Sequence, residues 1–196
     1  MINDNDIIKV LNTKGSVVAL KTDTVYGLVC NAYDIDAVNN IYKIKSREQK
    51  KPLSLFVKNI EEVNEYIKNL TPYCYEIMKK YWPGALTIIF EKKHNLFDYM
   101  TNNLDTIGIR IPNDKFLLNL LNNLTFPLAE TSCNISGEDA YKSFEEIKIK
   151  FKNKIDLIVD GGEVVDNIPS TVISIINDKI KVFRNGKIDI SGGVNG

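Results

Sequence analysis

A dense group of cations is the first feature of this chain that could do chemistry. Lys43, Lys45, Arg47, Lys50 and Lys51 fall between positions 43 and 51, at the end of a segment with helical periodicity. A helix dipole favours cations at that end by roughly 0.3–1 kcal/mol each. This effect accounts for one or two lysines, because five close positive charges repel one another unless an anion lies among them. The cluster therefore predicts a site for a phosphate chain or an RNA backbone.

Hydroxyl, carboxylate and amide groups gather in two other segments. Residues 22–28 supply two threonines, an aspartate, a tyrosine and a glycine, directly after the apolar run at 17–20. Ligands commonly bind at strand ends in α/β sheets, although a polar turn between a strand and a helix has the same composition. Residues 130–137 carry hydroxyls and an amide after the apolar run at 126–129. A plain Ser/Asn turn is the alternative interpretation there.

The segment at residues 105–112 contains a predicted strand with two different faces. Alternation places its three isoleucines on one face and Thr106, Gly108 and Arg110 on the other. That second face could simply meet solvent. Gly108 favours a ligand site instead, because glycine weakens a strand and often marks the close approach of a ligand or another backbone.

The last candidate residues are Ser170 and Arg184, which lie one predicted hairpin apart. An arginine beside a turn is usually solvated, so Arg184 alone is weak evidence. The only histidine, His94, sits in a polar loop, and neither a nucleophile elbow nor a Walker loop occurs. With no metal-ligand cluster in the sequence, the polar segments together suit the binding of a polyanion and an amino acid.

These segments must be positioned by alternating strands and helices. Strands are predicted at 17–20, 53–56, 86–90, 107–111, 155–159, 172–176 and 180–183. A helix is predicted at 36–44 with Asp34 as its N-cap, and further helix starts are expected at Thr71, at Asn113-Asp114 and at Ser143. Asn177-Asp178 predicts a hairpin and hence some antiparallel pairing. We therefore expect one α/β (α+β) domain at 1–196, with a mixed parallel and antiparallel sheet flanked by helices.

Composition narrows the class of protein. The 25 basic and 25 acidic residues balance, so a nucleic-acid partner would need a local basic patch. Three scattered cysteines form neither a disulfide framework nor a zinc-site spacing, which favours a reducing cytoplasm. The acidic N-terminus does not resemble a signal peptide, and no run approaches the ~20 apolar residues of a membrane span. A cytoplasmic protein is expected.

Taken in order, the polar segments resemble those of the YrdC-like family, the threonylcarbamoyl-AMP synthases, over about residues 7–188. The resemblance implies a YrdC/RibB-like fold in its short, single-domain form, with 189–196 as a flexible tail. It also implies a reaction of ATP, bicarbonate and L-threonine that yields threonylcarbamoyl-AMP and pyrophosphate. ATP would enter as a substrate with Mg²⁺, without a tightly bound cofactor. The product would pass to a complex that modifies tRNA, and residues 43–51 could contact tRNA.

The same resemblance assigns roles to individual residues. Lys45, Arg47 and Arg110 would be catalytic. Threonine would be bound by Thr24, Phe56, Arg110, Ser132 and Ser170. ATP would be bound by Lys45, Arg47, Lys51, Thr106, Asn134, Lys142 and Arg184. No residue is assigned to a resident metal ion.

Three residues depart from the family pattern: Lys21 and Glu48 replace prolines, and Cys133 replaces a small residue between Ser132 and Asn134. Two other functions remain open. One is a non-catalytic RNA-binding module that uses the basic cluster, although clustered aromatic residues for base stacking are lacking there. The other is a carbamoyl-transfer domain of the kind found in hydrogenase maturation, where such enzymes carry additional domains.

Overall fold

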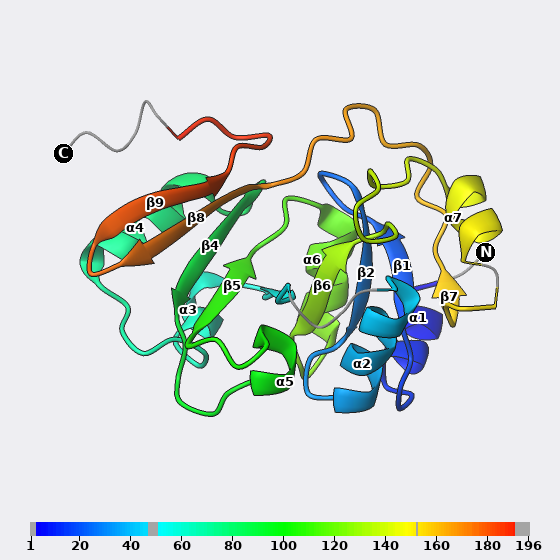
Figure 1. The fold of residues 1–196 in the computed structure, drawn as a ribbon, viewed down its shortest axis with the longest axis horizontal. Helices are drawn as coiled ribbons and strands as arrows, with labels where there is room; N and C mark the ends of the chain where they lie inside the picture. The colour runs from blue at the N-terminus through cyan, green and yellow to red at the C-terminus, as the bar shows by residue number, and fades with distance from the viewer. Residues whose placement is uncertain (1–2, 47–50, 152, 191–196) are drawn as a thin grey trace.

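The computed structural model describes residues 3–46, 51–151 and 153–190. Within these ranges, nine strands form one sheet in the order β7-β1-β2-β6-β3-β5-β4-β8-β9, which crosses the whole molecule in Figure 1. The strands are β1 (Val18–Lys21), β2 (Tyr26–Asn31), β3 (Ser54–Phe56), β4 (Leu86–Glu91), β5 (Thr106–Arg110), β6 (Leu128–Ser132), β7 (Leu157–Ile158), β8 (Thr171–Ile176) and β9 (Lys179–Arg184). The helices are α1 (Asp4–Leu11), α2 (Ile35–Ile44), α3 (Ile60–Val63), α4 (Pro72–Tyr81), α5 (Asp98–Thr101), α6 (Lys115–Asn123) and α7 (Phe144–Lys150).

The sheet is mixed, as predicted. The pairs β1–β7, β3–β5 and β4–β8 are parallel, and the other neighbouring strands run antiparallel. The predicted hairpin joins β8 to β9, with Asn177 and Asp178 at φ values of 51° and 57°. Asparagine and aspartate tolerate this left-handed region better than most residues. The prediction of a mixed sheet flanked by helices is therefore confirmed.

The helix starts also follow the predicted caps. Side chains accept hydrogen bonds from the first turn of each helix at Asp34, Thr71, Asp114 and Ser143. The capping box predicted at Ser143 forms only in part. The Glu146 carboxylate accepts from the Lys142 N–H at 2.7 Å, one residue before the cap. The side chain of Glu146 thus ties the preceding loop to the helix.

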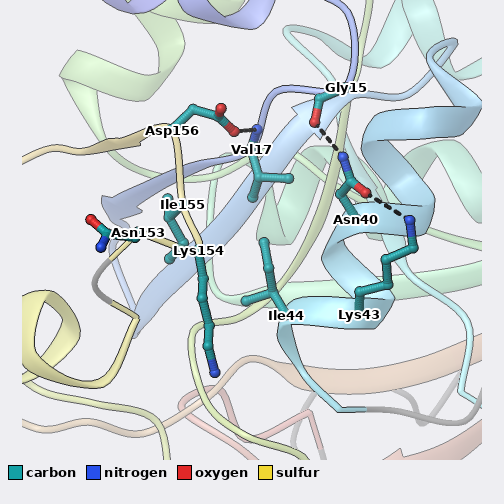
Figure 2. Close-up of a pocket in the computed structure, with 9 residues that line it drawn as sticks. All are labelled: Gly15, Val17, Asn40, Lys43, Ile44, Asn153, Lys154, Ile155 and Asp156. Atoms are coloured by element: carbon teal, nitrogen blue, oxygen red, sulfur yellow. Dashed lines mark hydrogen bonds between the residues drawn. The ribbon is translucent and has the colours of Figure 1, made fainter.

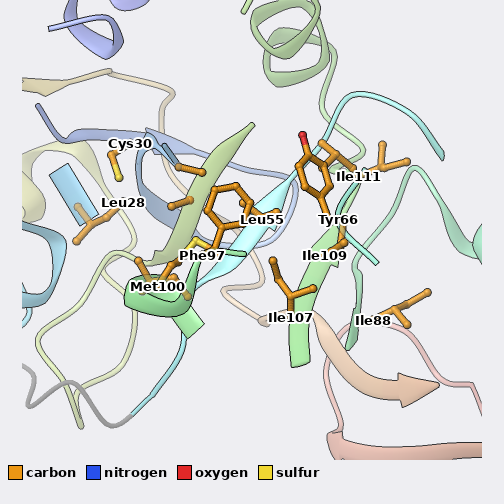
Figure 3. Packing of buried hydrophobic residues seen from close by; sticks show 14 of the residues in the cluster. Leu28, Cys30, Leu55, Tyr66, Ile88, Phe97, Met100, Ile107, Ile109 and Ile111 are labelled. Carbon is orange, nitrogen blue, oxygen red and sulfur yellow. The ribbon is translucent and has the colours of Figure 1, made fainter. Parts of the chain in front are cut away.

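Two hydrophobic clusters pack on the sheet, one on each face. The larger one joins α2, α3, α4, α5 and α7 to the apolar faces of the central strands, and Figure 3 shows its middle part around Leu55, Phe97 and Ile109. The smaller one joins α1 and α6 to residues such as Val18, Val29 and Leu128 on the opposite face. Burial of these side chains stabilises the fold by about 25 cal/mol for each Å² of apolar surface removed from water.

The smaller cluster covers only part of its face. Paired residues on neighbouring strands project from the same side of a sheet. Register therefore places the remaining residues of this face together: Gly27 lies opposite Ser132, and Ser54 lies opposite both Glu130 and Gly108. These residues are small or polar, so this part of the face can accept a ligand.

Some elements were not predicted from the sequence. Strand β2 and strand β6 occupy segments interpreted as possible polar turns, and helix α1 was missed. The predicted strand at 155–159 is reduced to Leu157–Ile158. The predicted tail also begins too early, because Ile190 is buried in the larger cluster. Residues 191–196 lie outside the described ranges.

Candidate active site

Arg110 occupies the centre of the polar face, at the end of β5. Its side chain is only 3% exposed. Nε donates to the Gly84 carbonyl at 2.9 Å, Nη1 donates to Thr24 Oγ1 at 3.1 Å, and Nη2 pairs with Asp23 Oδ1 at 2.5 Å. The solvent-facing alternative for this strand is therefore wrong at Arg110, and the fixed guanidinium faces the 22–25 loop. Such a planar fork can exchange one carboxylate partner for another.

The loop between β1 and β2 is shaped by Thr22. Its Oγ1 accepts from the N–H groups of Thr24 and Val25 and donates to the Val25 carbonyl at 2.7 Å. The same hydroxyl lies 3.0 Å from Thr24 Oγ1. This local network holds Thr24 against Arg110, so the loop works as a preformed wall of the site.

Lys45 is the inward-pointing member of the basic cluster. It caps the C-terminus of α2 and is 2% exposed. Its Nζ donates to the Ser132 carbonyl at 2.5 Å, to the Asn134 carbonyl at 3.0 Å and to Asn134 Oδ1 at 2.6 Å. Ser132 Oγ also donates to Asn134 Oδ1, at 2.8 Å. Lys45 and the Ser-x-Asn segment thus form one unit at the edge of the polar face.

Ser170 and Arg184 form a second unit on the other side of Arg110. Arg184 donates to the Ser170 carbonyl at 3.0 Å and to Ser170 Oγ at 3.1 Å. Ser170 Oγ lies 2.9 Å from Thr87 Oγ1, on the strand next to β5. Burial lowers the pKa of Arg184, and Arg110 acts in the same direction while Glu130 opposes it. The two arginines therefore build up positive potential toward the polar face.

The remaining predicted residues lie in different surroundings. Phe56 is fully buried and meets the site through Arg110, whose guanidinium carbon is 5.7 Å from the ring centroid. Thr106 is half-buried at the opposite end of β5 from Arg110. Lys51 and Lys142 are exposed. Arg47 lies outside the described residues.

The basic cluster is divided by the end of α2. Lys45 points to the Ser-x-Asn segment, whereas Lys43 is exposed and donates to Asn40 Oδ1 at 3.2 Å. Lys43 also borders a separate pocket of about 410 Å³. Figure 2 shows that pocket between α2 and the 153–156 segment, where Asp156 accepts from the Val17 N–H. The described cations therefore do not form one continuous patch.

Two carboxylates beside these residues, Asp23 and Glu130, lie in segments that the sequence singled out but received no role from it. Asp23 is the ion-pair partner of Arg110. Glu130 is half-buried on the polar face, two residues before Ser132. Burial raises the pKa of Glu130, and Asp23 adds to this, while Arg110, Arg184 and Lys45 act in the opposite direction. A strand assignment for 128–132 would have placed Glu130 and Ser132 on one face.

Two other features bear on the class of protein. In the part of the chain that the structure describes, no group of three or more His, Cys, Asp or Glu residues could hold a metal ion. Among the same residues, no helix is long and apolar enough to cross a membrane.

Comparisons with known proteins bear on the family and the fold. A family model for Sua5, YciO and YrdC, described as "Telomere recombination", matches residues 10–186. A putative threonylcarbamoyl-AMP synthase of Methanocaldococcus jannaschii is 39% identical over 90% of this chain and 82% of that protein. Pyrococcus abyssi Sua5 complexed with L-threonine superposes with a TM-score of 0.87, at 32% identity over 95% of this chain and 55% of that chain. Full-length HypF, in a phosphate- and nucleotide-bound form, gives a TM-score of 0.84 at 25% identity over 95% of this chain and 29% of that chain.

The extent of these matches differs. This chain spans most of the Methanocaldococcus protein, whereas it spans 52% of the threonylcarbamoyl-AMP synthase of Pyrococcus abyssi, to which it is 35% identical.

Proposed function

The chain belongs to the Sua5/YciO/YrdC family, and we propose on that basis that it is an L-threonylcarbamoyladenylate synthase. Its substrates would be ATP, bicarbonate and L-threonine, and its products threonylcarbamoyl-AMP and pyrophosphate. The observation that carries the proposal is the convergence of Thr24, Arg110, Lys45 and the Ser-x-Asn segment on one open sheet face. This set combines a carboxylate-binding fork with a second cationic centre.

Threonine binds on the Arg110 side of the site in this proposal. The substrate carboxylate replaces Asp23 on Nη2, and Thr24 stays beside it. Ser132 and Ser170 border the amino acid from either side, and Phe56 supports the guanidinium from beneath. Bidentate pairing is what distinguishes arginine from lysine at such a position.

ATP binds toward Lys45 and the exposed rim. Lys45 and Asn134 meet the phosphates, and Thr106, Lys142 and Arg184 contact other parts of the nucleotide. Arg47 and Lys51 add charge from the segment that follows α2. Mg²⁺ would arrive with ATP, coordinated by phosphate oxygens, as is usual for this ion.

The chemistry requires no covalent enzyme intermediate. Threonine's amine forms a carbon–nitrogen bond with bicarbonate-derived carbon, and water is released. A carbamate oxygen then bonds to the α-phosphorus of ATP while the bond to the leaving pyrophosphate breaks. Negative charge grows on the departing phosphates, so Lys45, Arg47 and Arg110 act chiefly by positioning and electrostatic stabilisation.

We further propose that the product is passed to a tRNA threonylcarbamoyl-transferase complex in the cytoplasm. The described cysteines, Cys30, Cys74 and Cys133, are free and buried, which suits a reducing compartment. Direct tRNA contact would use the exposed Lys43 and Lys51, because Lys45 is buried. Salt-dependent retention of tRNA, lost in a Lys43→Ala/Lys51→Ala variant, would test that contact.

Pyrophosphate release tests the function. We expect release that requires ATP, threonine and bicarbonate together, and its loss in Arg47→Ala/Lys51→Ala. Unchanged release in that variant would overturn the assignment of the phosphate site. Turnover with carbamoyl phosphate but without threonine would favour the carbamoyl-transfer alternative, and RNA binding without any turnover would favour the RNA-binding module.

A further inference from the structure

Glu130 projects into the middle of the proposed substrate site. It lies opposite Ser54 in the register of β3 and β6, on the same face as Ser132. Its Oε1 is 3.7 Å from the position that a Cβ atom on Gly27 would take. Val29 lies directly opposite it in β2, while Gly27 and Ser54 are its small neighbours on the side of the polar face.

The neighbouring cations do not neutralise Glu130 by direct pairing. Arg110 is engaged by Gly84, Thr24 and Asp23, Lys45 by Ser132 and Asn134, and Arg184 by Ser170. Among the described residues, none donates a hydrogen bond to the Glu130 carboxylate. At this half-buried position the Glu130 carboxylate is therefore available to pair with a ligand.

The charges of the substrates indicate what Glu130 would meet. ATP, bicarbonate and the carboxylate of threonine are anions, and they suit the surrounding arginines and lysine. The ammonium of threonine is the one organic cation among these substrates, and it must lose a proton before its nitrogen can attack carbon. A half-buried carboxylate whose pKa lies above its ordinary value of 4.5, because it is partly removed from water, is a suitable acceptor for that proton.

We propose that Glu130 binds the ammonium group of threonine and acts as the base that accepts its proton. This inference rests on the proposed function and adds a catalytic residue to it. One N–H bond breaks, the proton moves to a Glu130 oxygen, and the freed lone pair forms the bond to carbon. A second N–H proton leaves with the hydroxide of bicarbonate as water, and Glu130 returns its own proton to solvent.

A binding experiment separates this role from a structural one. Titration calorimetry would compare L-threonine with 3-hydroxybutanoate, the same molecule without its amine, in wild type and Glu130→Gln. One charge-assisted hydrogen bond predicts a preference for threonine of roughly 10- to 100-fold in wild type. We expect that preference to fall to roughly 3-fold or less in Glu130→Gln and to persist in Glu65→Gln, an exposed control.

The turnover rate provides a second readout. Wild-type kcat should rise with pH as Glu130 ionises. Glu130→Gln should still bind MgATP, but it should lose most of kcat and also the rise of kcat with pH. The inference would be overturned if wild type and Glu130→Gln discriminated equally between the two ligands. It would also be overturned by a defect confined to MgATP binding, which would indicate that Glu130 is a metal ligand. Failure of the wild type itself to bind threonine would instead overturn the proposed function.

Discussion

Replacing Asp23 by asparagine should make the stability of this protein depend on threonine. Asp23 pairs with Arg110 at 2.5 Å, and the two side chains are 12% and 3% exposed. The asparagine oxygen can still accept a hydrogen bond, but the buried guanidinium loses its counter-charge. A hydrogen bond to a charged group contributes about 1.5–3 kcal/mol, and a neutral replacement retains part of it. We therefore expect the free energy of unfolding to fall by about 1–2 kcal/mol without ligand.

Saturating threonine should restore most of this loss. If the substrate carboxylate displaces Asp23 from Arg110, the ligand supplies the missing charge equally in both proteins. Urea unfolding with and without threonine measures the difference in the free energy of unfolding between wild type and Asp23→Asn under each condition. In thermal unfolding, a difference of about 1–2 kcal/mol corresponds to a shift in Tm of roughly 2–8 °C at this chain length.

The matched control is Glu76→Gln, because Glu76 pairs with Lys79 at 3.5 Å with both side chains well exposed. Exposed pairs of this kind contribute about 0–1 kcal/mol, independently of ligand. A deficit in Asp23→Asn that is the same with and without saturating threonine would refute the placement of the substrate carboxylate at Arg110.

Three further variants test other parts of the site. Glu130→Gln should be more stable than wild type at neutral pH. Because the pKa of Glu130 is raised in the folded state, its stabilising contribution is complete below pH 4.5 and is lost as pH rises through the folded-state pKa. Thermal unfolding from pH 4 to 8 should therefore show a widening difference in stability between the two proteins, and a constant difference would contradict this. Gly108→Ala should fold normally, because the added Cβ would make ordinary van der Waals contacts with Thr87 at 3.4 Å and Ser54 at 3.7 Å. The methyl group should nevertheless narrow the site and raise the KM for threonine or ATP, and unchanged kinetics would show that no ligand approaches this strand. Lys45→Met should lower the free energy of unfolding by about 1–3 kcal/mol in chemical denaturation, because it removes the three hydrogen bonds that Lys45 donates to Ser132 and Asn134, and it should abolish pyrophosphate release. Retained activity would remove Lys45 from the phosphate site.

The sequence predicted the elements whose signals are local. Thr71 with Pro72, Asp34 and Asp114 mark helix starts through hydrogen bonds within one turn, and Asn177-Asp178 marks a hairpin through its own backbone preference. The alternation around Arg110 also predicted that Thr106, Gly108 and Arg110 share one face of a strand, as they do in β5. Such signals require no knowledge of distant parts of the chain.

The two strands that were missed, β2 and β6, depend on long-range pairing. Strand β6 contains Glu130 and Ser132 and lacks an apolar pattern, because one of its faces lines the site. Strand β2 is buried along nearly its whole length and so shows no alternation. The ion pair of Asp23 with Arg110 joins residues 87 positions apart, which no local pattern could indicate.

Identifying the product of the wild-type chain tests the proposed synthase activity. Mass spectrometry of reactions containing ATP, bicarbonate and, separately, threonine, serine or glycine would be combined with measurement of pyrophosphate. We expect threonylcarbamoyl-AMP and pyrophosphate in equal amounts, with threonine preferred and bicarbonate required. Pyrophosphate release without an amino-acid adduct, or an adduct formed without bicarbonate, would contradict the proposed activity.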